Sequence, residues 1–191
     1  MLPTIYEVRE VREELVRRPS FVLSSGYRRS DRRPVLLKYP GAMEYGDSDV
    51  LSEREYTLLR SLNLPGVPRP IDVIRRPGQN CTVFEDYGHR PLMNQRPGGP
   101  ALDLRQFLDL AISLCTIVGD LHRRGVTHRQ IQPCQIFRQP ESGELTLFCF
   151  AFATTGNPDD FGAPAIPPIA DLLAYASPEL TGRSIGIFRR R

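Results

Sequence analysis

The stretch GVTHRQIQPCQIF, residues 125–137, lies between two segments whose patterns differ sharply. Residues 101–125 repeat apolar residues at helical spacing and end in a glycine, which predicts a long amphipathic helix. After the stretch, residues 135–139 and 144–150 are short apolar runs around the turn PESG, which predicts a β-hairpin. The polar middle of GVTHRQIQPCQIF therefore predicts a loop held between a long helix and a hairpin. The expected buried face of the helix consists of Phe107, Leu110, Ala111, Leu114, Ile117, Val118 and Leu121.

The first ninety residues predict strands around one helix. Residues 21–29 and 33–40 are strand-like and flank the turn SDRRP. Residues 6–18, YEVREVREELVRR, are open to two interpretations, a strand or an amphipathic helix in which Glu and Arg recur at helical spacing. Residues 47–66 predict a helix, capped by Asp47 or Ser48. The remaining segments are two extended runs at 67–76 and 80–88, a loop at 90–100, and a long loop at 154–170. This order predicts an α+β fold with a strand-rich part and a mostly helical part.

The composition excludes several classes of protein. The chain has 191 residues, of which 40% are hydrophobic and 25% charged, and a net charge of +3, so a packed domain without a nucleic-acid or membrane partner is expected. Its four cysteines form no CxxC pair and no metal-ligand spacing with histidine, so no metal is expected. The N-terminus lacks the apolar region of a signal peptide, and Asp109 and Asp120 interrupt the longest apolar run. These features predict a cytoplasmic protein with free thiols.

Six segments in chain order resemble the protein kinase fold. The resemblance is to the Ser/Thr kinase-like domain that opens large bacterial multidomain signalling proteins, which also carry an ATPase-type module and a sensor histidine kinase. The segments are PVLLK (34–38), SEREYTLLRSLNLPGVPRPIDV (52–73), TVFEDYG (82–88), LHRRGVTHRQIQPCQIF (121–137), LTLFCFAFA (145–153) and LLAYASPELTGR (172–183). The resemblance implies two lobes: residues 1–87, an antiparallel sheet with helix C and a hinge at 85–87, and residues 88–191, a partial helical lobe with the remnants of the catalytic loop and activation segment.

The resemblance also implies a nucleotide site between the two lobes. In this family Lys38 would pair with phosphate, and Glu55 would be its partner on helix C. Phe84 would be the gatekeeper, and the backbone from Glu85 to Tyr87 would face adenine. His128 would anchor the loop by packing and hydrogen bonding, while Phe150, Ile136 and Phe137 would belong to the hydrophobic interior.

The catalytic positions of this pattern are replaced. Gln130 stands where the catalytic Asp belongs, Gln135 where a metal-binding Asn belongs, and Cys149 where the metal-binding Asp belongs. An amide is not a base, and Mg²⁺ prefers anionic oxygen to sulfur. No glycine occurs between Tyr6 and Val22, where a phosphate-cradling loop is expected. These losses predict a pseudokinase in which no catalytic site is intact, although the two glutamines would keep part of the hydrogen bonding of the loop.

The same reasoning predicts the ligands. ATP stays a candidate ligand, bound weakly and without metal, and Mg²⁺ is not expected. We expect a protein partner, or the remainder of a larger signalling protein, to contact the module. The resemblance also implies a truncated large lobe, so the apolar face left uncovered there would meet that partner or a second copy of the chain. Two alternatives remain open, an ATP-dependent serine/threonine kinase whose atypical metal site uses Asp159, Asp160 and Asp171, and a truncated fragment without function.

Overall fold

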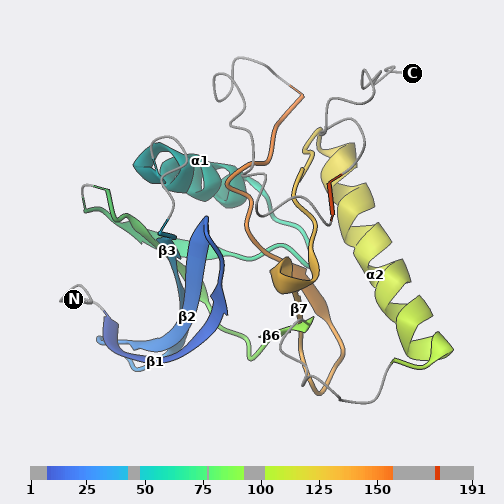
Figure 1. Cartoon of the computed structure of the whole chain (residues 1–191), viewed down its shortest axis with the longest axis horizontal. Coiled ribbons are helices and arrows are strands. Elements are labelled where there is room, and N and C mark those ends of the chain that lie inside the picture. Colours follow the sequence, from blue (N-terminus) through green and yellow to red (C-terminus); the bar gives the residue numbers. More distant parts are fainter. Residues whose placement is uncertain (1–7, 43–47, 77, 93–101, 157–174, 177–191) are drawn as a thin grey trace.

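The protein is an α+β domain built on a five-stranded antiparallel sheet (Figure 1). A computed structural model describes residues 8–42, 48–76, 78–92, 102–156 and 175–176. The sheet has the order β1-β2-β3-β5-β4, and its strands are β1 (Val8–Arg17), β2 (Phe21–Arg28), β3 (Pro34–Pro40), β4 (Pro70–Ile74) and β5 (Cys81–Glu85). A second, three-stranded sheet has the order β6-β7-β8 and consists of β6 (Arg90–Pro91), β7 (Ile136–Arg138) and β8 (Leu145–Leu147). The predicted α+β class is confirmed, and so is the hairpin of β7 and β8.

The segment with two interpretations forms a strand. β1 pairs with β2 along its length, although the register shifts at three places. Leu15 and Val16 are both buried, whereas Arg12, Glu13 and Glu14 are exposed. Pairing with β2 and burial of these two apolar side chains therefore outweigh the helical spacing of the charged residues.

Strand β3 faces two separate apolar clusters. Leu36 belongs to the large core, where it lies opposite Phe84 of β5 in the pairing register. Its neighbours Val35 and Leu37 point to the other face and pack in a smaller cluster with Cys81 and Val83. Side chains alternate along a strand, so Lys38 lies on the same face as Leu36. This alternation directs the ammonium group toward helix α1 (Ser48–Ser61), which lies along one face of the sheet.

Helix α2 (Leu104–Arg123) stands beside the second sheet (Figure 1). It begins with a capping box, because the side chain of Asp103 accepts a hydrogen bond from the Gln106 backbone and the side chain of Gln106 accepts one from the Asp103 backbone. The predicted core face is correct toward the C-terminal half, where Ile117 and Leu121 are buried. It is wrong at Phe107, which is 54% exposed because the core reaches only the later turns of the helix.

One further prediction is corrected by the structure, and several others concern residues outside the described ranges. Arg90 and Pro91, predicted as loop, pair with β7 as the short strand β6. A 3-10 turn over Pro133–Gln135 leads into β7. Asp159, Asp160 and Asp171, most of the loop predicted at 154–170 and the SPE motif of residues 177–179 lie outside the described residues. No helix in the described ranges is long and apolar enough to cross a membrane.

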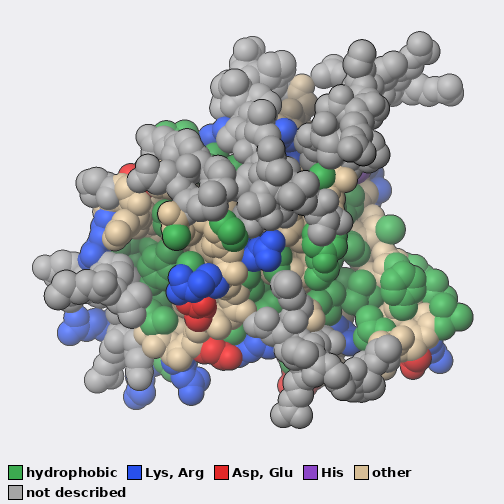
Figure 2. Space-filling view, viewed as in Figure 1, with side chains coloured by type: hydrophobic (Ala, Val, Ile, Leu, Met, Phe, Trp, Pro, Cys, Tyr) green, Lys and Arg blue, Asp and Glu red, His purple; other side chains and the backbone are tan. Residues whose placement is uncertain are grey.

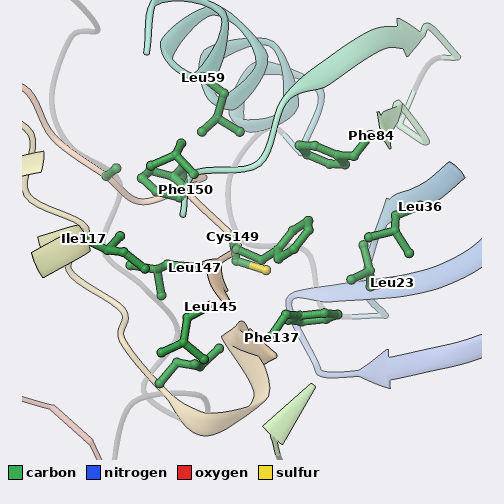
Figure 3. Close-up of a cluster of buried hydrophobic side chains, with 14 of the residues drawn as sticks. Leu23, Leu36, Leu59, Phe84, Ile117, Phe137, Leu145, Leu147, Cys149 and Phe150 are labelled. Carbon is green, nitrogen blue, oxygen red and sulfur yellow. The ribbon is translucent and has the colours of Figure 1, made fainter. Parts of the chain in front are cut away.

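One hydrophobic core joins the two sheets. Figure 3 shows Leu23, Leu36 and Phe84 from the large sheet in one buried cluster with Phe137 of β7 and Leu147 of β8. All five side chains are almost completely buried. The core therefore runs across the domain boundary predicted between residues 87 and 88, and division of the chain at that point stays a prediction.

Candidate functional site

The centre of the candidate site is a buried ion pair between Lys38 of β3 and Glu55 of α1. Lys38 is 8% exposed and Glu55 is 1% exposed. A charge that is buried without an opposite partner is strongly destabilising, so this contact fixes the position of α1 relative to the sheet. The contact expected between these two residues is present, while their role in binding a nucleotide stays a prediction.

Glu55 has a second partner far away in the sequence. Its other carboxylate oxygen, Oε1, accepts a hydrogen bond of 2.7 Å from the backbone N–H of Phe150. The carboxylate therefore ties together a strand, a helix and the segment that follows β8. This bond has no signature in the sequence, because any residue at position 150 other than proline would supply the same donor.

The environment of Lys38 keeps it charged. Burial alone would lower the pKa of its ammonium group, but the negative charge of Glu55, the proximity of Cys149 and the hydrogen bond to Glu55 together raise that pKa above its ordinary value. The site therefore holds a permanent cation at neutral pH, which one carboxylate balances.

Cys149 lies beside this pair with an unusual backbone conformation. Its φ angle is +70°, in the left-handed region that residues with a Cβ rarely adopt. The side chain is 3% exposed and forms no disulfide. The left-handed conformation turns the chain immediately after β8, and the next residue, Phe150, presents its N–H to Glu55. A thiol at this position offers no hard anionic oxygen for Mg²⁺.

His128 anchors the polar loop in a single tautomer. Its Nε2 lies 3.0 Å from the carbonyl oxygen of Phe148, so Nε2 carries the proton and donates. Its Nδ1 accepts from the backbone N–H of Gln130 at 3.3 Å, and the ring packs edge-on against Phe150 at 4.6 Å. Burial lowers the pKa of His128 to about 4, and Lys38 adds to this effect. The predicted role of His128 as a packing and hydrogen-bonding anchor is confirmed.

The two glutamines do not hydrogen-bond as the sequence predicts. Gln130 is 3% exposed, and its Nε2 has no hydrogen-bond partner. Gln135 is completely buried, and neither Nε2 nor Oε1 of its side chain has a partner. Only its backbone is bonded, to Gln132 and Phe148. The expectation that both side chains keep part of the hydrogen bonding of the loop is therefore wrong for these three atoms. Each unpaired buried amide atom costs stability.

Two small cavities border the site. One has a volume of about 40 Å³ and is lined by Lys38, Gln130 and Cys149 together with residues of β3, α1 and the segment after β8. The other has a volume of about 30 Å³ and is lined by Glu85, Tyr87 and His89 among others. Pockets for drug-sized ligands usually measure roughly 300–1,000 Å³. Each cavity therefore holds about a water or two in this conformation.

Aromatic side chains fill the space next to the two cavities. Phe84 is completely buried, and Phe148 packs on it edge-on at 5.7 Å and on Phe137 at 4.5 Å. The sequence does not mark Phe148 as a site residue, although its place in the apolar run LTLFCF indicates that it is buried. Lys38, Gln130 and Cys149 line the same cavity, whereas Glu85 and Tyr87 line the other one. Gln135 lies in the loop, where its backbone carbonyl accepts from Phe148.

The backbone after Phe84 is partly engaged within the protein. The N–H of Glu85 donates to the carbonyl of Arg69 at 3.4 Å, and the N–H of Asp86 donates to Pro34 at 3.3 Å. Tyr87 is 58% exposed. Two of the backbone donors in the segment predicted to face adenine are thus already occupied, and the binding of adenine there stays a prediction.

Within the described ranges, no group of three or more His, Cys, Asp or Glu residues is arranged to hold a metal ion. No protein-family model matches the chain, and no curated protein matches it.

Proposed function

We propose that the chain is a protein kinase-like module without phosphotransferase chemistry, which acts in signalling by binding a protein partner. The observation that carries the proposal is the contrast around Glu55. The buried pair of Lys38 and Glu55 is complete, whereas the positions of the expected catalytic and metal-binding residues, 130, 135 and 149, hold two glutamines and a cysteine. Phosphoryl transfer needs Mg²⁺ and a group that orients the attacking hydroxyl, and these side chains supply neither.

The small size of the cavity at Lys38 supports the same proposal. Lys38 lines a cavity of only about 40 Å³, and its charge is already balanced by Glu55. ATP would have to displace side chains or separate α1 from the sheet before its phosphates could approach the ammonium group. Weak nucleotide binding that is indifferent to Mg²⁺ is the most that this arrangement supports.

A structural role explains why the pair is kept. Glu55 holds α1, β3 and the backbone of Phe150 together, so it maintains the shape of the module without any bound nucleotide. This proposal includes three further statements: the chain has the two-lobed kinase architecture, it belongs to a bacterial multidomain signalling protein, and it is cytoplasmic. The four cysteines form no disulfide, which fits a reducing compartment.

A thermal-unfolding titration with millimolar ATP, with and without Mg²⁺, tests the proposal. A ligand that binds the native state raises the midpoint of unfolding by mass action. We expect no rise that depends on Mg²⁺. The second measurement is transfer of labelled γ-phosphate to the chain or to a generic protein substrate, with Lys38→Met as the control. A large Mg²⁺-dependent stabilisation, or transfer that Lys38→Met abolishes, would contradict the proposal and favour an atypical kinase.

A further inference from the structure

Helix α2 has a second group of apolar side chains that is exposed in the part of the chain that the structure describes. Its members are Leu104, Phe107, Leu108 and Ile112, which are 73%, 54%, 47% and 64% exposed. We call these four residues the open α2 face. Figure 2 shows hydrophobic side chains gathered at the end of the molecule where the N-terminal turns of α2 lie. Large apolar side chains that gather in one exposed place usually mark an interaction surface.

Three members of the open α2 face, Leu104, Leu108 and Ile112, point away from the face that packs on the core, whereas Phe107 lies on the edge between the two. Leu104, Leu108 and Ile112 follow one another at intervals of four residues, which forms a ridge of the kind that packs between helices. With 3.6 residues per turn, this ridge points roughly 160° around the axis from the side that buries Ile117 and Leu121. The core therefore does not use the ridge, and an apolar surface on a second helix would complement it.

Charged residues along one edge of the ridge indicate that the second helix is α2 of another copy of this chain. Arg105 and Asp109, both exposed, lie on the edge away from Phe107. A two-fold axis perpendicular to α2 places this edge against the same edge of another copy, with the direction reversed. Arg105 then faces Asp109 of the partner subunit, and Asp109 faces Arg105 of the partner subunit. A parallel pair would instead set the charged edge against the apolar side that carries Phe107.

We propose that the open α2 face binds a second copy of this chain, by antiparallel packing of α2 on α2 about a two-fold axis near Leu108. In this register Leu108 meets Leu108 of the partner subunit, and Leu104 meets Ile112 of the partner subunit. Two symmetric pairs of Arg105 and Asp109 flank the apolar contact. The proposal rests on α2 alone, so it holds or fails independently of the kinase-like function.

Sedimentation of the full chain from submicromolar to about 100 µM tests whether the dimer forms. We expect a reversible dimer. Leu108→Lys places two like charges on the two-fold axis and should weaken dimerisation at least about a hundredfold. Ser113→Lys, which alters an exposed polar position on another side of α2, is the matched control and should leave dimerisation unchanged. A chain that stays monomeric throughout this range overturns the proposal, because another segment or a different protein would then cover the face.

Charge reversal tests the orientation of the two helices. Arg105→Asp alone sets like charges against each other at both edges and should weaken the dimer about tenfold, and so should Asp109→Arg alone. The double variant reverses both charges and should restore the affinity of the original chain. Thermal unfolding at submicromolar concentration separates these effects from changes in the stability of the monomer. Failure of the double variant to restore dimerisation overturns the antiparallel arrangement.

Disulfide cross-linking provides an independent readout. In a Cys115→Ser background, Leu108→Cys should form an intermolecular disulfide when diamide accepts the two electrons and two protons of the thiols. The exposed Cys115 of the original chain should not cross-link, because its two copies would lie about 21 Å apart along the helices. Preferential cross-linking through Cys115 would indicate a parallel pair and overturn the proposal.

Discussion

Glu55 accepts from Lys38 with one carboxylate oxygen and from the backbone N–H of Phe150 with the other. The two donors lie on opposite sides of the carboxylate in sequence, 17 residues before it and 95 residues after it. A single buried side chain therefore connects the first sheet with the segment that follows the second. This arrangement satisfies the carboxylate without a metal or a phosphate.

Removing either partner of the ion pair should destabilise the fold strongly. Lys38→Met leaves the Glu55 carboxylate with the Phe150 N–H as its remaining donor, and Glu55→Gln leaves a buried ammonium group without its anion. Each change should lower the free energy of unfolding by about 3–5 kcal/mol. The double variant should lose clearly less than the sum, because Gln at position 55 still accepts from Phe150 and no charge remains buried. Urea unfolding of the four proteins measures the coupling, and strictly additive losses would contradict it.

Stability should fall with pH through the range in which His128 titrates. The pKa of His128 is lowered from 6.5 to about 4 in the folded protein. Above pH 6.5 the side chain is neutral in both states and stability is unaffected. Below pH 6.5 the unfolded chain binds a proton that the folded protein resists until about pH 4, and the difference in pKa corresponds to roughly 3 kcal/mol.

Urea unfolding between pH 7 and pH 4.5 measures this loss. His128→Asn should unfold more easily at pH 7 but show a shallower fall with pH. The matched control is His122→Asn, at an exposed position of α2, which should keep the steep dependence of the original chain. An equal slope in all three proteins would show that His128 does not contribute to the acid sensitivity.

The sequence predicts the secondary-structure elements of the fold better than the contacts between them. Alternation and turn residues suffice for β2, β3 and the β7–β8 hairpin, because these elements are local and their apolar residues face one core. Residues 6–18 fit both the two-residue period of a strand and the 3.6-residue period of a helix. Only the pairing with β2 shows that they form a strand. Phe107 was misassigned for a related reason, since periodicity shows that a helix is amphipathic but not how far along it the core extends.

The contacts of the candidate site also differ in how well the sequence predicts them. The contact of Lys38 with Glu55 could be predicted because it joins two side chains whose charges and elements the sequence displays. The bond from Phe150 could not, because a backbone N–H has no signature in the sequence. The predicted hydrogen bonds fail at Nε2 of Gln130 and at both amide atoms of Gln135, because both side chains are buried and these three atoms find no partner.

Replacing Gln135 by Met should be neutral or stabilising. Both amide atoms of Gln135 are buried without hydrogen-bond partners, and Met fills a similar volume without polar atoms. We expect a gain of up to about 1–2 kcal/mol in the free energy of unfolding. The matched control is Gln132→Met, which should destabilise because the Oε1 of this buried side chain accepts from the thiol of Cys134. A loss above about 1 kcal/mol for Gln135→Met would show that a bound water or a ligand satisfies the amide.

Truncation along α2 should show where the core ends. Leu121 is completely buried, so Leu121→Ala should cost about 2–5 kcal/mol in the free energy of unfolding. Phe107 was expected on the same face, but it is 54% exposed, so Phe107→Ala should cost less than about 0.5 kcal/mol at submicromolar concentration, where any association is negligible. Both are measured by urea unfolding. A loss of several kcal/mol for Phe107→Ala would mean that the first turns of α2 are covered in the folded monomer, and this result would also remove the apolar surface on which the proposed dimer depends.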